Sequence, residues 1–330
     1  MAHKIGTHNG HFHCDEALAC FMLKKLPEYS DSEIVRTRDT ATLNKCNIVV
    51  DVGGVYDHHK MRYDHHQREF KDTMKSLDIL PKFTTKLSSA GLVYAHYGRR
   101  VIGVILGVSN EDPCLDVLFE KVYESFIEEV DAGDNGIPPF DGTPRYHVST
   151  TLAARVGHLN PPWNDEHKNY DEGFKKAVEL VGTELTDRVK YYYKSWLPAR
   201  EVVLKALNER FEVDEGGKVL MFADGGAPWK EHFFQLEEDL ELQDERITYV
   251  TYPDDSGMWR IQAIPVNKLQ GFESRLPLPE KWRGVRDADL EAVCGISGAT
   301  FCHASGFIGG NKTREGALSM ARKSLELAGQ

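Results

Sequence analysis

Short apolar runs alternate with segments of helical periodicity through the first part of the chain. The apolar runs predict strands at Lys4–Thr7, Glu33–Arg38 and Asn47–Asp51. In Asp15–Leu26 the apolar residues recur every three or four positions, and two acids at its start favour a helix N-terminus there. Strands that alternate with helices are typical of a parallel sheet with helices packed on it. The pattern therefore predicts an α/β fold.

Longer helical segments follow in the middle of the chain. A helix is predicted at Ser88–Tyr97, where Ser88 is a suitable N-cap, and a long amphipathic helix at Pro113–Asp131. The apolar run Val101–Gly107 fits either a helix or a strand. Residues 137–165 are rich in Pro, Gly, Asn and Asp, which predicts loops with short helical pieces at most.

The last part of the chain returns to strands and turns. Its predicted elements are a helix from Tyr170 to about Arg210 interrupted by Pro198, a strand at Lys218–Ala223, a hairpin of Arg246–Tyr252 and Met258–Ile264, a Gly-rich loop, and a helix at Thr313–Leu327. Single cores stop growing near about 250–300 residues, so 330 residues predict two domains. We place them at residues 1–195 and 196–330, with the boundary in the long helical segment.

Composition and charge narrow the possible functions. The chain is 41% apolar and 28% charged, as in ordinary globular proteins, and no apolar run approaches the roughly 20 residues of a membrane span. The opening MAHKIGTHNG resembles neither a signal nor a transit peptide, so a soluble protein of the cytoplasm or nucleus is expected. Six scattered cysteines without a C-x-x-C pair predict free thiols rather than disulfides. A net charge of −11 argues against nucleic-acid binding by a broad, positively charged surface. A nucleic-acid substrate would therefore need a local basic patch.

Three short segments near the N-terminus concentrate imidazoles and carboxylates. Mixed ligands of this kind suit a first-row divalent cation such as Mn²⁺. An acid at the carboxyl end of a parallel strand lies where open α/β sheets bind ligands. Two-metal hydrolysis of phosphate esters needs one bridging carboxylate among several Asp and His ligands. The pattern therefore predicts a metal-dependent phosphoesterase. The candidate residues are His8, His11, His13, Asp15, Asp51, Asp64, His65 and His66.

The spacing within these segments suggests separate roles. His13 and Asp15 are two residues apart, so their side chains lie on one side of an extended segment. His65 and His66 are adjacent, so one can bind metal while the other faces substrate or an orienting partner. A histidine-rich polar surface or a structural zinc site are the alternatives. The triplet Asp57-His58-His59 has the same composition as the later Asp64-His65-His66.

Two further clusters complete the candidate chemistry. Asp131 and Asp134 lie near a predicted helix C-terminus, where acids are unfavourable unless a cation is bound. In the second half, glycines followed by a basic helix start could hold a phosphate, although a structural turn would have the same sequence. The residues of this candidate substrate loop are His303, Gly309, Gly310, Lys312 and Arg314. In the same half, arginines lie beside aromatic residues, as in Trp259-Arg260. Such pairs could bind single-stranded RNA, or the tryptophans could be core residues and the arginines surface residues.

Four segments together resemble a known family. They are THNGHFHCDEALA, RYDHHQREF, EVDAGDNGI and HASGFIGGNKTREGAL, and they resemble the DHH phosphoesterase superfamily, more narrowly the melanocyte-proliferating-gene family of exonucleases. The resemblance implies a parallel-sheet catalytic domain, a smaller α/β substrate-binding domain with a Gly-rich loop, and a cleft between them. It also implies Mn²⁺- or Mg²⁺-dependent 3′→5′ cleavage of single-stranded RNA or short oligonucleotides, in nucleus and mitochondrion.

The resemblance also assigns roles to particular residues. It implies two ions and favours Asp64 over Asp57 as the signature acid, Asp51 as the bridging carboxylate and His66 on the substrate side. The ligands that it implies are His13, Asp15, Asp51, His65 and Asp131, with His8, His11 and Asp134 as further candidates. Many superfamily members have H-x-x-x-D-x-D at the first segment; here His13 replaces the first Asp, which leaves His8 and His11 as alternatives. Rival functions are a small-molecule phosphoesterase and a non-catalytic RNA-binding protein with a relict metal site.

Overall fold

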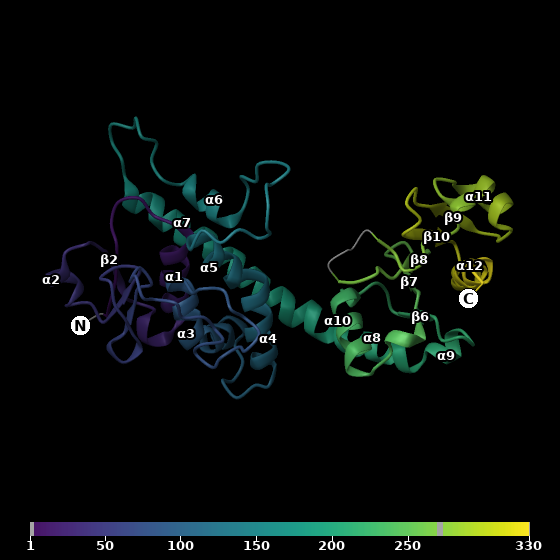
Figure 1. Ribbon diagram of the computed structural model, residues 1–330, viewed down its shortest axis with the longest axis horizontal. Helices are drawn as coiled ribbons and strands as arrows, with labels where there is room; N and C mark the ends of the chain where they lie inside the picture. The colour runs from purple at the N-terminus through teal and green to yellow at the C-terminus, as the bar shows by residue number, and fades with distance from the viewer. Residues whose placement is uncertain (1–2, 269–272, 330) are drawn as a thin grey trace. The chain divides into compact units, whose positions relative to one another are not determined.

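A computed structural model of the chain describes residues 3–268 and 273–329. The chain divides into two compact units, Met1–Tyr193 and Lys194–Gln330, and each is described by itself (Figure 1). All six cysteines are free thiols, as expected, and five of them are buried. Within the described residues, every helix is too short or too polar to cross a membrane.

The first unit is built on a five-stranded sheet with the order β2-β1-β3-β5-β4. Its strands are β1 (Lys4–Thr7), β2 (Glu33–Arg36), β3 (Ile48–Val50), β4 (Tyr56–Asp57) and β5 (Arg62–Tyr63). Strands β2, β1, β3 and β5 run parallel, and only the edge strand β4 is antiparallel to its neighbour. The predicted parallel sheet and its first three strands are confirmed. Strands β4 and β5 were missed because two residues are too few for any periodicity to show.

Helices cover this sheet. They are α1 (Cys14–Lys25), α2 (Thr40–Leu43), α3 (Ser89–Leu106), α4 (Cys114–Val122), α5 (Glu128–Asp134), α6 (Leu152–Gly157) and α7 (Tyr170–Tyr191), with short 3₁₀ turns at Pro27–Tyr29 and His58–Lys60. The run at Val101–Gly107 is the last part of α3. The helix predicted at Pro113–Asp131 is two α-helices joined by a π-helical turn at Tyr123–Ile127, and it continues to Asp134.

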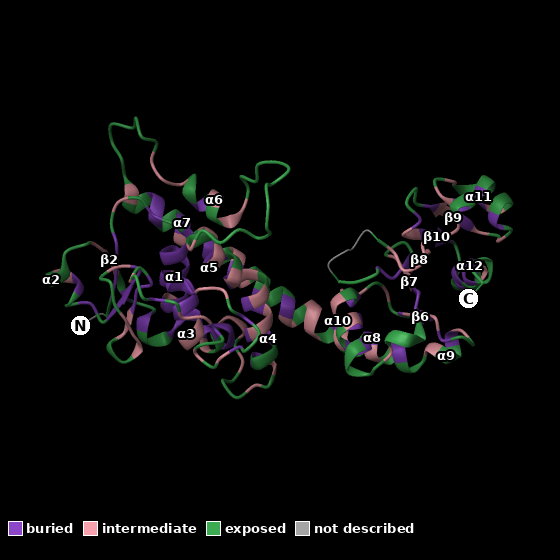
Figure 2. Cartoon of the chain, viewed as in Figure 1, coloured by how far each residue is buried: buried purple, intermediate pink, exposed green. Residues whose placement is uncertain are grey.

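Helix α1 lies in the middle of the first unit, packed between α3 and α7 (Figures 1 and 2). Nine of its twelve residues are buried, including Asp15 and Glu16 in the first turn. Two glycines of α7 allow the close contact: a methyl group on Gly182 would overlap the ring of Phe21, and one on Gly173 would press on the ring of Phe12. The chain segment that carries the first candidate ligands is therefore held firmly in the core.

The second unit contains a sheet with the order β6-β7-β8-β10-β9, in which only the β6–β7 pair is parallel. Its strands are β6 (Val219–Met221), β7 (Tyr249–Pro253), β8 (Trp259–Ala263), β9 (Ala299–Cys302) and β10 (Ile308–Asn311). A π-helical turn at Tyr192–Trp196 follows α7, and the remaining helices are α8 (Leu197–Asn208), α9 (Arg210–Val213), α10 (Trp229–Asp239), α11 (Asp287–Cys294) and α12 (Arg314–Leu327), with 3₁₀ turns at Gln243–Glu245 and Glu280–Trp282.

One expectation for the second unit was wrong. Gly309 and Gly310 do not lie in a loop; they form strand β10, between β8 and β9. Close packing explains the glycines, because a methyl group on Gly309 would lie 2.9 Å from Leu278 Cδ1 and one on Gly310 would lie 2.6 Å from Thr300 Oγ1. The predicted hairpin of β7 and β8 and the final helix are confirmed.

Candidate metal centre

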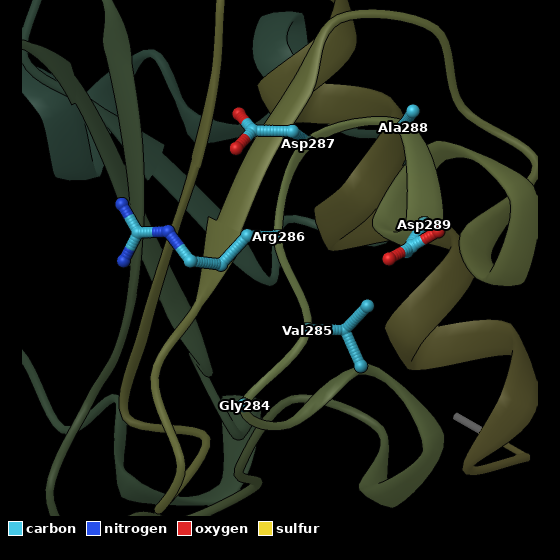
Figure 3. A pocket seen from close by; sticks show the side chains of 6 residues that line it. All are labelled: Gly284, Val285, Arg286, Asp287, Ala288 and Asp289. Carbon is cyan, nitrogen blue, oxygen red and sulfur yellow. The ribbon is translucent and has the colours of Figure 1, made fainter.

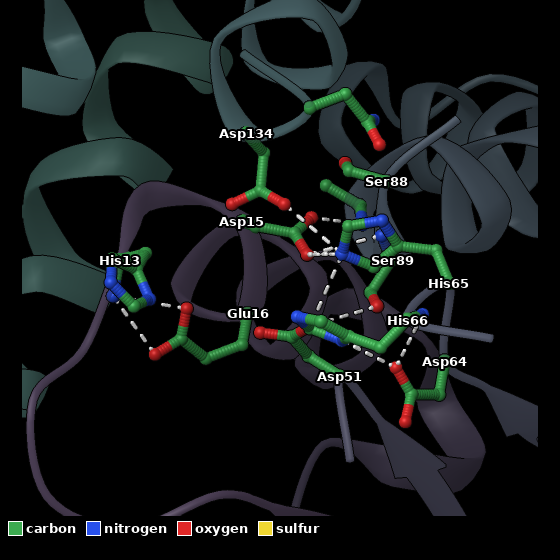
Figure 4. A network of polar contacts seen from close by, with 12 residues as sticks. His13, Asp15, Glu16, Asp51, Asp64, His65, His66, Ser88, Ser89 and Asp134 are labelled. Atoms are coloured by element: carbon green, nitrogen blue, oxygen red, sulfur yellow. Dashed lines mark hydrogen bonds and ion pairs between the residues drawn. The ribbon is translucent and has the colours of Figure 1, made fainter. Parts of the chain in front are cut away.

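The sheet order of the first unit brings three of the candidate segments together. Strands β1, β3 and β5 are neighbours and parallel, so their carboxyl ends lie at one edge. His8 follows β1, Asp51 follows β3, and Asp64 follows β5. Helix α1 begins beside them and adds His13 and Asp15 (Figure 4). Adjacent carboxyl ends of parallel strands are where open α/β sheets bind their ligands.

Asp51 lies at the centre of this group. Its Oδ2 is 3.4 Å from His8 Nε2, and its Oδ1 is 3.4 Å from both His65 Nε2 and His66 Nδ1. Burial favours the neutral form of Asp51, yet the imidazoles of His65 and His8 outweigh burial and hold its pKa below the ordinary range. Asp51 has a left-handed backbone, with φ of 56°, a conformation that Asp and Asn tolerate better than most residues. One carboxylate thus faces three histidines from two chain segments.

His65 is surrounded by three carboxylates. Its Nε2 lies 3.0 Å from Asp134 Oδ2, 3.4 Å from Asp51 Oδ1 and 3.7 Å from Asp15 Oδ2. Burial lowers the tendency of the ring to protonate, but the carboxylates of Asp134 and Asp51 outweigh it and raise the pKa of His65 to about 10. Although Nε2 is buried among these oxygens, it is aligned for a hydrogen bond with no group in residues 3–268 and 273–329. A nitrogen that points between three carboxylates has the arrangement of a metal ligand.

The N-terminus of α3 fixes Asp15. The backbone N–H groups of Ala90 and Ser89 donate to its two carboxylate oxygens at 2.5 and 3.1 Å. Complete burial and the nearby carboxylates of Asp51 and Asp134 nevertheless raise the pKa of Asp15 well above its usual value. Three carboxylates gathered around a single imidazole are costly, and a divalent cation would relieve their repulsion.

A second group forms at the start of α1. His8 Nε2 lies 3.1 Å from Glu16 Oε1, and the backbone N–H of His13 donates to both oxygens of Glu16, at 3.0 and 3.1 Å. Burial opposes protonation of His8, but Asp51 and Glu16 outweigh it and raise its pKa to about 10. Sequence reasoning missed Glu16. Its position three residues after the N-cap His13 indicates a helix cap, and only its complete burial beside His8 indicates more.

Asp64 and His66 form an orienting pair beside Asp51. Asp64 Oδ2 accepts from the Gly54 N–H at 2.5 Å, and Asp64 Oδ1 lies 2.7 Å from His66 Nδ1. The contact with Asp64 raises the pKa of His66 although partial burial of the ring opposes the rise. Because Nδ1 is occupied and the side chain is 62% exposed, the Nε2 atom of His66 is the ring nitrogen left to meet a substrate.

The earlier triplet is placed differently. Asp57 caps the turn at His58–Lys60 by accepting from two of its N–H groups, and the ring of His58 stacks on His96 at 3.8 Å. These contacts give Asp57 and His58 structural roles.

Two predicted metal ligands, Asp131 and His11, lie outside these groups of ligand atoms. The buried Asp131 carboxylate accepts from the N–H and hydroxyl of Ser88, at 2.9 and 2.7 Å, and from the Tyr123 hydroxyl at 3.0 Å. Burial raises the pKa of Asp131 to about 7, although these hydrogen bonds oppose the rise. Asp134, three residues on, is the acid that reaches His65. His11 is exposed, with its ring 5.4 Å from that of His13.

The predicted substrate residues of the second unit lie around β10. His303 Nδ1 contacts the Ser305 hydroxyl at 2.9 Å, and Lys312 and Arg314 are exposed beyond the strand. Gly310 pairs with Arg260 on one side and Phe301 on the other, and Arg286 forms a bridge with Phe301. The guanidinium carbons of Arg260 and Arg286 lie 5.1 and 5.8 Å from the Phe301 ring centre. Figure 3 shows Arg286 reaching away from Asp289 at the rim of a pocket formed by residues 284–289.

The donor sets fit divalent cations. In the part of the chain that the structure describes, ligand atoms within 4.8 Å of one another form three groups: His8, His13 and Glu16; Asp51, His65 and His66; and Asp15, His65 and Asp134. Imidazole and carboxylate together suit Mn²⁺ and related ions, whereas the thiolates of a structural zinc site are missing from these groups. The fit is tested by His65 Nε2, which lies among three carboxylates and has no aligned hydrogen bond within the described residues. Buried His, Asp and Glu clusters of this kind could hold metal, as predicted.

Comparison with known proteins shows the family to which the chain belongs. The family model of the MYG1 exonucleases, described as "Uncharacterised protein family (UPF0160)", matches residues 4–325. The chain belongs to this family. It is 55% identical to the MYG1 exonuclease of Homo sapiens over 323 residues, which cover 98% of this chain and 85% of the human protein. It is 54% identical to a MYG1 protein of Caenorhabditis elegans over 328 residues, 99% of this chain and 96% of the relative. A MYG1 protein of Dictyostelium discoideum is 47% identical over 325 residues, 97% and 96% of the two chains. The predicted family is confirmed.

Proposed function

We propose that this member of the MYG1 family is a metal-dependent 3′→5′ exonuclease that hydrolyses phosphodiester bonds, chiefly of RNA. The human and mouse relatives are named exonucleases, and both cover 98% of this chain. The four motifs that resemble the DHH phosphoesterase superfamily extend the proposal to membership of that superfamily and to action in nucleus and mitochondrion. The acidic net charge of −11 favours short substrates over long duplexes.

The donor groups suggest where two Mn²⁺ or Mg²⁺ ions would bind. His8 and His13, with Glu16 beside them, would hold one, and Asp15, His65 and Asp134 would hold the other. Asp51 faces both sets, with Oδ2 towards His8 and Oδ1 towards His65, as a bridging carboxylate must. When bound, two such ions would activate water and neutralise charge on the phosphoryl oxygens.

The residues of the chain would supply orientation and a proton. Asp64 holds the His66 ring through Nδ1 and favours its charged form, so the exposed Nε2 can donate a hydrogen bond or a proton to a phosphodiester oxygen. The α3 N-terminus fixes Asp15 through two backbone N–H groups, and Ser89 Oγ lies 3.4 Å from Asp51 Oδ1. A preorganised set of this kind loses little entropy on binding. The second unit would contribute His303, Lys312 and Arg314 to substrate binding.

The position of Asp51 among three histidines of two chain segments carries this proposal. Its test is cleavage of a 5′-labelled ten-nucleotide RNA with Mn²⁺ by the intact chain, by Asp51→Asn and by His65→Ala. Asn suits the left-handed backbone at position 51, so the first variant should lose the charge and keep the fold. The matched control is His59→Ala, which removes an exposed histidine of the structural triplet.

We expect a ladder that shortens from the 3′ end with the intact chain and the control, and none with the two site variants or with chelator. Near-full activity in either site variant would refute the assigned site. Release of phosphate from pyrophosphate or cleavage of dinucleotides alone would favour a small-molecule phosphoesterase. A chain that binds RNA but cleaves nothing and binds no metal would be a binding protein with a relict site.

A further inference from the structure

Two exposed segments of the first unit carry an unusual set of aromatic side chains. Every residue from Gly136 to Thr150 is exposed, and so are residues 162–169 (Figure 2). Tyr146 and Phe140 in the first segment are 76% and 51% exposed, and Trp163 in the second is 87% exposed. Exposed aromatic rings offer flat faces on which the bases of a single strand can stack.

Both segments are anchored at the rim of the metal centre. In the first segment Ile137 lies three residues after Asp134, which contacts His65, and the N–H of Ile137 donates to Ala132 O at 2.8 Å. The second is fixed through Asn160, whose Oδ1 accepts from the Phe12 N–H at 3.0 Å and whose Nδ2 donates to Phe12 O at 2.9 Å. Phe12 directly precedes His13. Three residues span at most about 10 Å, so both segments start within one or two nucleotides of the metal ligands.

The composition of these segments fits single-stranded nucleic acid. Together the two segments hold two Lys and Arg, three Asp and Glu, and two histidines, in a chain with a net charge of −11. Arg145 and His147 flank Tyr146, so cationic groups lie beside the exposed ring. The first segment also lines a pocket of about 1010 Å³, whose lining residues are 138–148 and Thr151. Pro138, Pro139 and Pro144 are among them. Prolines restrict the backbone, which lowers the entropy lost when a ligand binds.

We propose that Trp163, Tyr146 and Phe140 form a stacking surface for the bases of a single-stranded oligonucleotide whose terminal phosphodiester lies at the metal centre. The inference rests on the proposed nuclease function and adds the residues that grip the bases. Stacking on aromatics tolerates any base sequence, because every base offers a flat face. The surface would therefore select single strands over duplexes, whose bases are already stacked.

The test compares Trp163→Ala and Tyr146→Ala with Tyr191→Ala, which removes a 44% exposed tyrosine from α7 of the same unit. Steady-state cleavage is measured with Mn²⁺ on a ten-nucleotide RNA and on bis(p-nitrophenyl) phosphate, a diester with no base to stack. We expect KM for the RNA to rise about tenfold in each of the first two variants, at the lower part of the range for one stacked base. The small diester should be hydrolysed as by the intact chain.

Two further readouts make the result specific. RNA should quench the exposed part of the tryptophan emission of the intact chain and not that of Trp163→Phe. Unchanged KM and quenching in the Trp163 variants, in a chain that cleaves RNA, would overturn this inference and leave the proposed function standing. Loss of self-association in Trp163→Ala, with KM unchanged, would also overturn it, in favour of contact between copies. Hydrolysis of the small diester without any cleavage of RNA would refute both together.

Discussion

Asp131 and Asp134 are three residues apart and have different proposed roles. Asp134 is a proposed metal ligand, whereas Asp131 supports the fold. Asp134 lies 3.0 Å from His65 and within 4.8 Å of Asp15, whereas the Asp131 carboxylate is occupied by Ser88 and Tyr123. We therefore predict that Asp134→Asn removes tight binding of one ion and that Asp131→Asn does not. The two variants make the same chemical change on one helix, so each controls for the other.

The two variants should differ in metal affinity and in stability. Loss of an outer partner of a ligand lowers metal affinity about 10–100-fold, so loss of a direct ligand should lower it at least 100-fold, or about 2.8 kcal/mol. Asp131→Asn keeps an oxygen for Ser88 but turns an amide towards Tyr123. That change should leave metal affinity within about threefold and cost roughly 1–3 kcal/mol of unfolding free energy.

Titration with Mn²⁺ in competition with a fluorescent chelator measures the affinity, and urea unfolding in excess chelator measures the stability of both variants. The assignment fails if Asp131→Asn abolishes binding of an ion while Asp134→Asn retains it. Equal losses in both variants would mean that the end of α5 moves as a unit, and would refute the separation of roles.

Three other outcomes follow from the same contacts. Removal of metal should lower the midpoint of thermal unfolding, because each ion at about 1,000 times its Kd stabilises the native state by about 4 kcal/mol; a midpoint unchanged by chelator would contradict the site. Asp64→Asn should lower kcat about 10–100-fold and leave metal affinity unchanged, since Asp64 orients His66 and belongs to none of the three donor groups of the described residues; competition titration beside cleavage assays distinguishes this from loss of a ligand. Burial raises the pKa of Asp131 to about 7, so the native metal-free chain holds a proton that the unfolded chain releases above about pH 4. The contribution of this proton to stability therefore falls as pH rises towards 7 and is level above it. Asp131→Asn should accordingly cost roughly 2–3 kcal/mol more unfolding free energy at pH 5 than at pH 8, as measured by urea unfolding with chelator. An equal cost at both pH values would refute the raised pKa.

The residues at the centre of the site could be predicted from their chemistry, because Asp51 follows a predicted strand and His65 lies in a run of acids and histidines. Their closeness depends on β5, which was missed from sequence and lies beside β3 in the sheet. The choice between Asp131 and Asp134 could not be predicted. The π-helical turn at Tyr123–Ile127 adds a residue to one turn and rotates everything after it by about 100°, and regular helical spacing gives no sign of it.

Glu16 and the glycines of β10 escaped prediction for a different reason. A glutamate three residues after an N-cap has the same sequence pattern whether it only caps the helix or also reaches a histidine, and only the position of His8 decides. Gly309 and Gly310 predict a loop by their flexibility, but here they allow β10 to pack closely against Leu278 and Thr300. In both cases the deciding contact comes from a residue outside the local motif that carries the pattern.

The glycines of α7 have a consequence for natural variation in this family. Gly182 and Gly173 touch no candidate ligand, and alanine would suit the middle of a helix better by about 1 kcal/mol. Yet a methyl group at either position would push against Phe21 or Phe12, and Phe12 is bonded to His13. A conservative substitution on a remote helix would thus shift the ligand loop without altering a single ligand. Variants at these two glycines should be interpreted alongside those of the metal site rather than as neutral changes in a connector.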